Sequence, residues 1–278
     1  MDPAAWSAAT PYVEGDRVML TTTHLIYECL AAVTGGNSPD VDVLALVPKW
    51  ITVQYINELC MFDYNNNIST VTYDPADSIT ATITPSQQIN SIFLVGLENV
   101  YKVTVSMKDV SDTEVYTYSL DQIALNQKIY YLALLDVSTI PCTTTIVMTG
   151  NGTDLISCRY CSVGQKIYIG EVQSGISMDN SNFSLVERDM YGTVTLVPRR
   201  TVAKLGYRLF VQNYDVEDLI NTRNKLNAVP SIWYAMENIS TAIPEYNDNL
   251  IMMGIYKNFS ITLDSQLSAT LTLELEEI

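Results

Sequence analysis

The chain has 278 residues, of which 47% are hydrophobic and only 17% charged, so it has enough apolar material for one large β domain or several small ones. Acidic residues outnumber basic residues 31 to 15, which gives a formal charge of −16. A field of that sign repels phosphates and anionic lipids, so nucleic-acid binding is not expected. The longest apolar runs, such as Ile129–Leu135 and Leu250–Ile255, are too short to span a bilayer, so no membrane insertion is expected.

Residues 1–56 are predicted to form a small aromatic β module. Gly15-Asp16 is typical of a turn between two short strands, and a second turn follows at residues 35–39. A unit this small has little aliphatic volume and needs aromatic residues for a core. The aromatic residues that we expect to form this core or to contact a carbohydrate or a protein partner are Trp6, Tyr12, Tyr27 and Trp50.

The order of residues in this module, W-S-x-x-T-x-Y-x-x-G-D-x-V followed by Y-x-C, resembles the small chitin- and cellulose-binding-like modules. It is also similar to the N-terminal unit of bacteriophage tail-region proteins, which Tyr27-Glu28-Cys29-Leu30 fits well. The resemblance implies that these aromatic positions are mostly core. Sugar-binding members use a pair of exposed rings, whereas Lys49-Trp50 supplies one ring here. A docking or folding role is therefore expected ahead of sugar binding.

Residues 57–180 are predicted to form a β-sandwich or jelly roll. The segment shows many short strand patterns with frequent polar turns and little helix signal. Strands are expected over Ile79–Ile83, Val100–Val105, Val115–Tyr118, Thr143–Met148, Cys158–Cys161, Gln165–Ile169 and Ser174–Met178.

The chain has five cysteines, at positions 29, 60, 142, 158 and 161. An odd number, with no signal peptide at the start of the sequence, favours reduced thiols and folding in a cytoplasm. Cys158-x-x-Cys161 has metal-ligand spacing, but no second pair and no nearby histidine completes four ligands. Its flanks read as strands, whereas a redox motif of this kind opens a helix. No metal is expected there.

Residues 181–278 are predicted to form an α+β unit with one helix on an antiparallel sheet. Asp215 is a good helix N-cap, Glu217 and Asp218 suit the first turn, and Pro230 stops the helix. Val216, Leu219, Ile220 and Leu226 form an apolar stripe of helical period with Arg223 on the same side. Strands are expected over Thr193–Val197, Tyr207–Val211, Ser231–Met236, Leu250–Tyr256, Asn258–Leu263 and Ala269–Leu275.

This C-terminal unit resembles the sheet-plus-helix domains of phage tail tubes and distal tail rings. Residues 254–261 match a G-x-Y-x-x-F-S-I pattern that precedes a terminal strand in phage tail-region proteins. The resemblance implies assembly into rings through protein contacts. The last strand alternates like an edge strand that extends a neighbour's sheet, and the predicted assembly surface is Glu274, Glu276 and Ile278. The alternative is an ordinary last strand whose charged side chains keep it from pairing with another chain.

The sequence offers little for catalysis. The single histidine, His24, lies in a Thr-rich turn and is expected to be solvated. No GxSxG, Walker A, GxGxxG or HExxH motif occurs, and Glu171, Glu187 and Asp189 show no pairing of the kind that a glycosidase uses. The loop acids Asp40, Asp42, Asp63, Asp74 and Asp77 suit Ca²⁺ but lack EF-hand spacing, so the sequence assigns no cofactor.

The sequence patterns predict a non-enzymatic, mainly β structural protein, and the resemblance of its two terminal units implies that it belongs to a bacteriophage tail. It would be made in the host cytoplasm, form a homo-oligomer and contact other tail proteins. The 18 tyrosines against 5 phenylalanines suit protein interfaces, although tyrosine also suits strands. A carbohydrate-binding protein that contacts host glycans is the alternative, and an enzyme ranks third.

Overall fold

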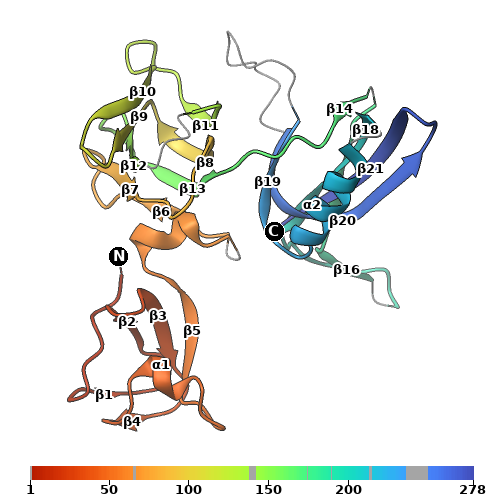
Figure 1. The fold of residues 1–278 in the computed structure, drawn as a ribbon. Coiled ribbons are helices and arrows are strands. Elements are labelled where there is room, and N and C mark those ends of the chain that lie inside the picture. Colours follow the sequence, from red (N-terminus) through yellow and green to blue (C-terminus); the bar gives the residue numbers. More distant parts are fainter. Residues whose placement is uncertain are drawn as a thin grey trace. The chain divides into compact units, whose positions relative to one another are not determined.

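The computed structural model describes residues 2–64, 67–137, 142–173, 175–188, 190–212, 215–235 and 250–278. The chain divides into two compact units, Met1–Gln165 and Lys166–Ile278. Strands dominate both units (Figure 1), so the prediction of a mainly β fold is confirmed.

The first unit begins with the aromatic module. Its largest sheet has the order β2-β3-β5, and β1 pairs separately with β4. Six buried side chains form its core: Tyr12, Val18, Leu20, Tyr27, Cys29 and Trp50. The elements are β1 (Pro11–Tyr12), β2 (Arg17–Leu20), β3 (Leu25–Cys29), β4 (Val33–Thr34), α1 (Pro39–Asp42) and β5 (Trp50–Tyr55).

A 3₁₀ helix, η1 (Asn57–Phe62), follows the module. Its first residue, Asn57, forms hydrogen bonds both with the start of the chain and with strand β6 (Thr70–Val71). The backbone N–H of Asn57 donates to Asp2 at 3.0 Å. Its side chain pairs with the backbone of Val71, donating to the carbonyl at 2.7 Å and accepting from the N–H at 3.0 Å. Cys60 and Met61 of this helix are buried, and Met61 belongs to the hydrophobic core of the next part of the unit.

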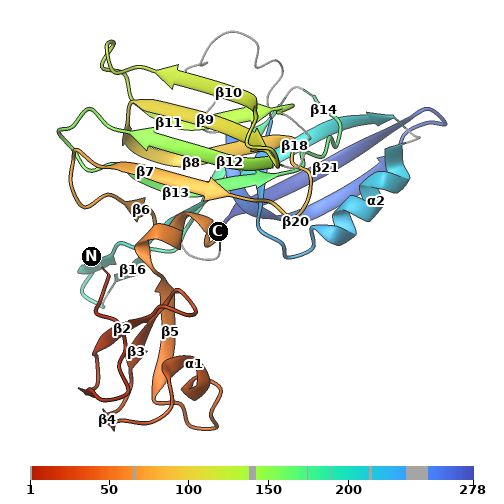
Figure 2. The ribbon, with the colours of Figure 1, turned by 60° about the vertical axis from the view of Figure 1, so that its left-hand side comes forward.

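The rest of the first unit is a β-sandwich of two antiparallel sheets. One sheet has the order β10-β9-β12-β7 and the other β11-β8-β13-β6 (Figure 2). Ile92, Leu94, Ile146 and Met148 are among the fully buried residues of its core. The strands are β6 (Thr70–Val71), β7 (Ser78–Ile83), β8 (Ser91–Val100), β9 (Lys102–Asp109), β10 (Glu114–Asp121), β11 (Ile129–Leu135), β12 (Cys142–Thr149) and β13 (Ser157–Gly164).

One predicted strand of the sandwich is divided. We expected a single strand over Val100–Val105, but β8 ends at Val100 and β9 starts at Lys102 in the other sheet. Asn99 has a φ of 56°, a left-handed conformation that asparagine tolerates better than most residues. This turn lets the chain cross from one sheet to the other at Tyr101. Val100 therefore belongs to one sheet, and Val103 and Val105 belong to the other.

The second unit is one antiparallel sheet with a helix on it. The sheet order is β14-β18-β21-β20-β19, and β15 also pairs with β18. Leu205, Leu209, Leu271 and Leu273 are buried in its core with Leu219 of the helix. The elements are β14 (Glu171–Val172), β15 (Ser177–Asn182), β16 (Leu185–Arg188), β17 (Val194–Val197), β18 (Thr201–Gln212), α2 (Val216–Lys225), β19 (Ser231–Tyr234), β20 (Ile251–Leu263) and β21 (Ser268–Glu277).

Helix α2 agrees with the sequence prediction in its position. Asp215 occupies the N-cap position but its side chain makes no capping hydrogen bond, and Glu217 and Asp218 lie in the first turn. Leu219 and Thr222 are buried against the sheet. The predicted stripe is wrong at Ile220, which is exposed, because the buried face continues through Thr222 instead.

Other boundaries differ from the prediction. Residues 165–169, expected to be a strand, form no strand and connect the two units. We placed a domain boundary after residue 180, but β14 and β15 pair with β18, which puts residues 171–182 in the second unit. The two strands expected over Leu250–Leu263 are one strand, β20, with a bulge between Tyr256 and Asn258. Of the predicted strand 231–236, Met236 lies outside the described residues, and Ser174 of the strand 174–178 does as well.

Candidate assembly surfaces

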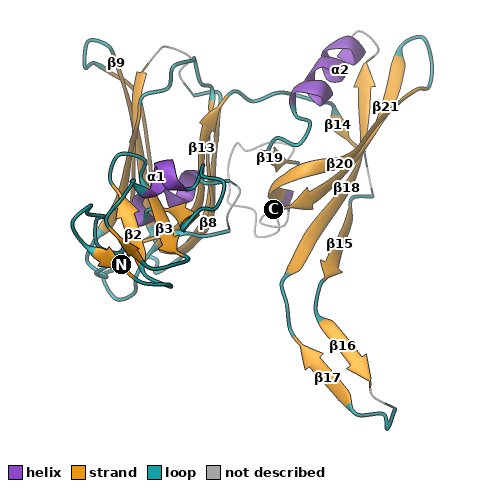
Figure 3. Cartoon of the chain, turned by 90° about the horizontal axis from the view of Figure 1, so that it is seen from below, coloured by secondary structure: helices purple, strands orange, loops and turns teal. Residues whose placement is uncertain are grey.

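The second unit carries a two-stranded ribbon that leaves its sheet. β15 and β18 pair up to Asn182 and Thr201, after which the chain continues into β16 and β17, which pair with each other. Figure 3 shows β16 and β17 extending beyond the ends of β15 and β18. Within the described residues, no third strand pairs with β16 or β17. We call residues 183–198 the arm.

The junction between sheet and arm is set by Pro198. Proline has no backbone N–H, so the ladder of hydrogen bonds between the two strands is interrupted at Pro198. The Ser184 hydroxyl bridges the break instead: it accepts from the Arg199 N–H at 2.9 Å and donates to the Arg199 carbonyl at 3.3 Å. The two strands therefore stay hydrogen-bonded across the junction.

Large apolar side chains on the arm face solvent. Val186 is 62% exposed and Leu196 66%, while Met190 and Tyr191 at the tip are 88% and 87% exposed. A two-stranded hairpin with no packed face is marginally stable in water, and contiguous exposed apolar surface marks an interaction site. The arm is therefore the strongest candidate for a docking element in the second unit.

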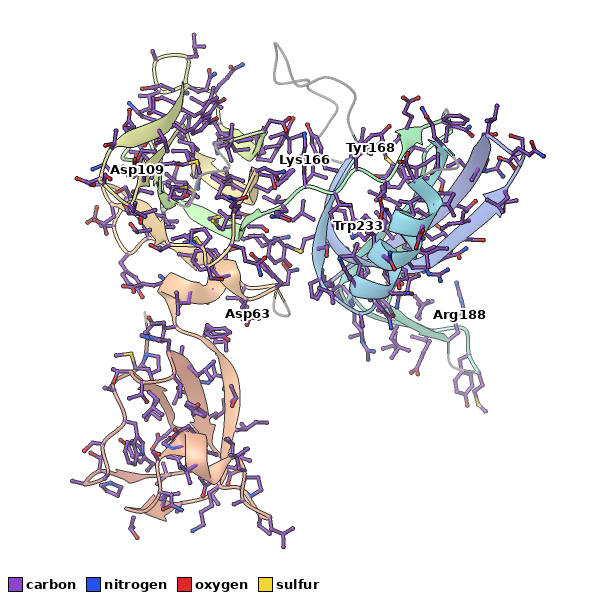
Figure 4. The ribbon with its side chains drawn as sticks, in the orientation of Figure 1. Asp63, Asp109, Lys166, Tyr168, Arg188 and Trp233 are labelled. Atoms are coloured by element: carbon purple, nitrogen blue, oxygen red, sulfur yellow. The ribbon has the colours of Figure 1, made fainter. Side chains whose placement is uncertain are left out.

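One face of the arm combines apolar and basic character. Val186 lies opposite Leu196, and Arg188 lies opposite Val194. Because alternate strand residues share a face, these four side chains lie on the same side of the ribbon. Arg188 projects from the arm in Figure 4. Arg188 is the one basic residue of the arm, against the two acids Glu187 and Asp189, so residues 183–198 have a net charge of −1 and the basic character is confined to the face that carries Arg188.

A groove of about 420 Å³ lies at the far end of β18 from the arm. Three carboxylates line it, Glu171 from β14 and Asp215 and Asp218 from the start of α2. Its apolar walls include the exposed side chains of Ile167, Tyr168 and Phe210. The full lining is Ile167, Tyr168, Ile169, Gly170, Glu171, Phe210, Val211, Gln212, Asp215, Asp218, Leu219 and Thr222.

The segment that forms one wall of the groove needs glycine at position 170. Gly170 has a φ of +133°, and a Cβ there would lie 2.7 Å from the Phe210 carbonyl oxygen. Any side chain at this position would push the segment away from β18. The close approach keeps Tyr168 and Glu171 beside the end of β18.

The C-terminal strand does not provide the free edge that we predicted from the sequence. β21 pairs with β18 on one side and with β20 on the other, so its backbone hydrogen bonds are used within the sheet. Glu276 lies within reach of Lys204 and Lys257, at 3.8 and 3.0 Å. The Ile278 N–H donates to the Met253 carbonyl at 3.4 Å, and Glu274 is exposed on the sheet face. Strand order depends on long-range pairing, which the alternating pattern of β21 does not encode.

The four predicted contact aromatics of the N-terminal module lie in or against its core. Tyr12, Tyr27 and Trp50 are buried, and Trp6 packs on them with partial exposure. The rings of Tyr12 and Trp50 meet edge to face with centroids 5.3 Å apart. The Tyr12 hydroxyl accepts from the Ser7 N–H at 2.8 Å. A buried ring cannot stack on a sugar, so these residues hold the module together.

The module also exposes apolar side chains that the sequence reading did not single out. Leu44, Leu46 and Val47 follow α1 and are largely exposed. The loop is held at both ends, since Asp42 accepts from the backbone N–H groups of Lys49 and Trp50 at 2.6 and 3.1 Å. This loop is a second exposed apolar surface, and Asp42, one of the acids to which the sequence assigned no ion, holds its end through these two hydrogen bonds.

The residues considered for chemistry are dispersed. All five cysteines are buried free thiols, and burial raises the pKa of Cys60 to about 11 and that of Cys161 to about 12. His24 is exposed in a turn, as predicted. Asp189 lies outside the described residues, and within the described part of the chain no three histidine, cysteine or acidic side chains gather as metal ligands.

The chain matches no protein-family model and no curated protein sequence. Its function is therefore inferred from its own surfaces. Among the described helices, none is long and apolar enough to cross a membrane.

Neither the arm nor the groove was predicted from the sequence. The sequence predicted a strand at residues 193–197 as part of a sheet, although Gly192 and Pro198 bracket it closely. That spacing, with the polar run Asn180-Ser181-Asn182 before the partner strand, is the only local signal of a separate hairpin. The groove joins residues more than forty positions apart, which no local pattern indicates.

Proposed function

We propose that this chain is a structural component of a bacteriophage tail that acts through protein–protein assembly. The observation that carries the proposal is the arm, a two-stranded ribbon with exposed Val186 and Leu196 on one face and exposed Met190 and Tyr191 at its tip. Such a ribbon has no core of its own and gains stability when a partner covers it. The phage tail as the setting rests on the resemblance of residues 254–261 and of the N-terminal module to tail-region proteins.

The alternative, a carbohydrate-binding protein, is less well supported. It needs exposed, coplanar rings, whereas the module's predicted contact aromatics are mostly buried. The arm exposes two aromatic residues, Phe183 at its base and Tyr191 at its tip, and Tyr191 lies next to Met190 in the chain. Methionine and tyrosine together are typical of protein interfaces.

Virus particles purified from cells that make this protein test the proposal. The chain is expected to co-purify with the particles in a fixed ratio to the other structural proteins, and antibodies against it are expected to label the tail by electron microscopy. Labelling confined to the capsid, or particles that lack the chain, would contradict the proposed location. Labelling lost after treatment with a soluble glycan would favour the carbohydrate-binding alternative.

A further inference from the structure

The arm and the groove lie at opposite ends of the same strand. The arm joins β18 at Thr201, and the groove is lined by Phe210, Val211 and Gln212 at the other end of that strand. Nine residues of extended chain span about 30 Å. The arm also points away from the sheet (Figure 3), so it cannot reach the groove of its own chain.

The two surfaces complement each other in chemistry. The arm face offers Val186 and Leu196 with Arg188 beside them. The groove offers the apolar rings of Tyr168 and Phe210 with three carboxylates around them. A chain of charge −16 repels its own copies, so a contact between copies needs a place where its few basic residues meet acids.

We propose that the arm of one copy docks into the groove of a second copy of this chain, with Arg188 directed toward Asp218 and Glu171. This inference rests on the proposed assembly function and names the partner surface. Because the arm and the groove are different patches, a pair of copies has one arm and one groove left over: the first copy keeps its groove free and the second keeps its arm free. Such a head-to-tail contact builds either a closed ring or an open filament.

Charge reversal tests the pairing in the full-length protein. Arg188→Glu and Asp218→Arg are each expected to lower the association constant by about 10-fold, measured by sedimentation velocity over a concentration series. The double variant is expected to return to within about 3-fold of the wild type, because the two reversed charges attract again. Lys225→Glu is the matched control: it changes charge at the other end of α2 and is expected to leave association unchanged. Thermal unfolding checks that each variant is folded.

The outcomes separate the inference from the proposed function. If the wild type associates but the double variant shows no recovery, the arm docks elsewhere, and this inference fails while assembly stands. If Lys225→Glu weakens association as much as Arg188→Glu, the effect is one of net charge and the pairing is likewise wrong. If the wild type is a monomer at every concentration, docking between copies is overturned, whereas the location of the chain in the tail is decided by the antibody labelling.

Discussion

Replacing Trp50 by alanine is expected to unfold the N-terminal module while the β-sandwich stays folded. The Trp50 side chain is 1% exposed and packs edge to face on Tyr12 at 5.3 Å. Removing a buried tryptophan costs about 3–5 kcal/mol, which is close to the entire stability that a core of six buried side chains can supply. The sandwich has its own larger core and does not depend on this ring.

Limited proteolysis followed by mass spectrometry measures this effect. In Trp50→Ala, cleavage is expected within residues 2–56 under conditions that leave the wild type intact. Ile51→Ala is the control, since Ile51 is the next residue of β5 and is 50% exposed, so its loss should change stability by less than about 0.5 kcal/mol. A Trp50→Ala protein as resistant as the wild type would show that this ring is not the centre of the core.

Replacing Leu273 by alanine is expected to destabilise the second unit by about 2–5 kcal/mol. Leu273 is buried between Tyr207 of β18 and Phe259 of β20, which lie opposite it in the two ladders. An interior strand that loses a large side chain leaves a cavity with neighbours on both sides. A true edge strand would lose less, because it packs against a single neighbour.

Calorimetry separates the two units if each unfolds in its own transition. The transition of residues 166–278 is expected to fall by on the order of 10 °C in Leu273→Ala, with the other transition unchanged. Glu274→Ala serves as the control, because Glu274 is the next residue and is exposed. Equal effects of the two substitutions would refute the interior position of β21.

The parts of the fold that depend on local chemistry could be predicted from the sequence. Asp215 as an N-cap, acids in the first turn and Leu219 on the buried face place α2 correctly. Alternation of β-branched residues found most strands of the sandwich. The aromatic residues of the module were predicted as core or contact positions, and the structure places Tyr12, Tyr27 and Trp50 in the core.

The parts that depend on pairing over long distances could not be predicted. The last strand alternates apolar and acidic residues whether it lies at an edge or, as here, between β18 and β20. Val186 and Leu196 have the composition of ordinary strand residues, so nothing local shows that their ribbon leaves the sheet. The groove arises because Gly170 lets one segment approach the end of β18, and that contact spans forty residues of sequence.

The central claim is that the arm mediates assembly, and light scattering of the full-length protein over a concentration series tests it most directly. The wild type is expected to increase in mass with concentration, whereas the double variant Val186→Ser/Leu196→Ser stays monomeric and unfolds at nearly the same temperature, because both side chains are mostly exposed. Val110→Ser, which removes an exposed valine from the sandwich, should associate like the wild type. A double variant that associates as strongly as the wild type, or a wild type that never associates, would contradict assembly between copies through the arm.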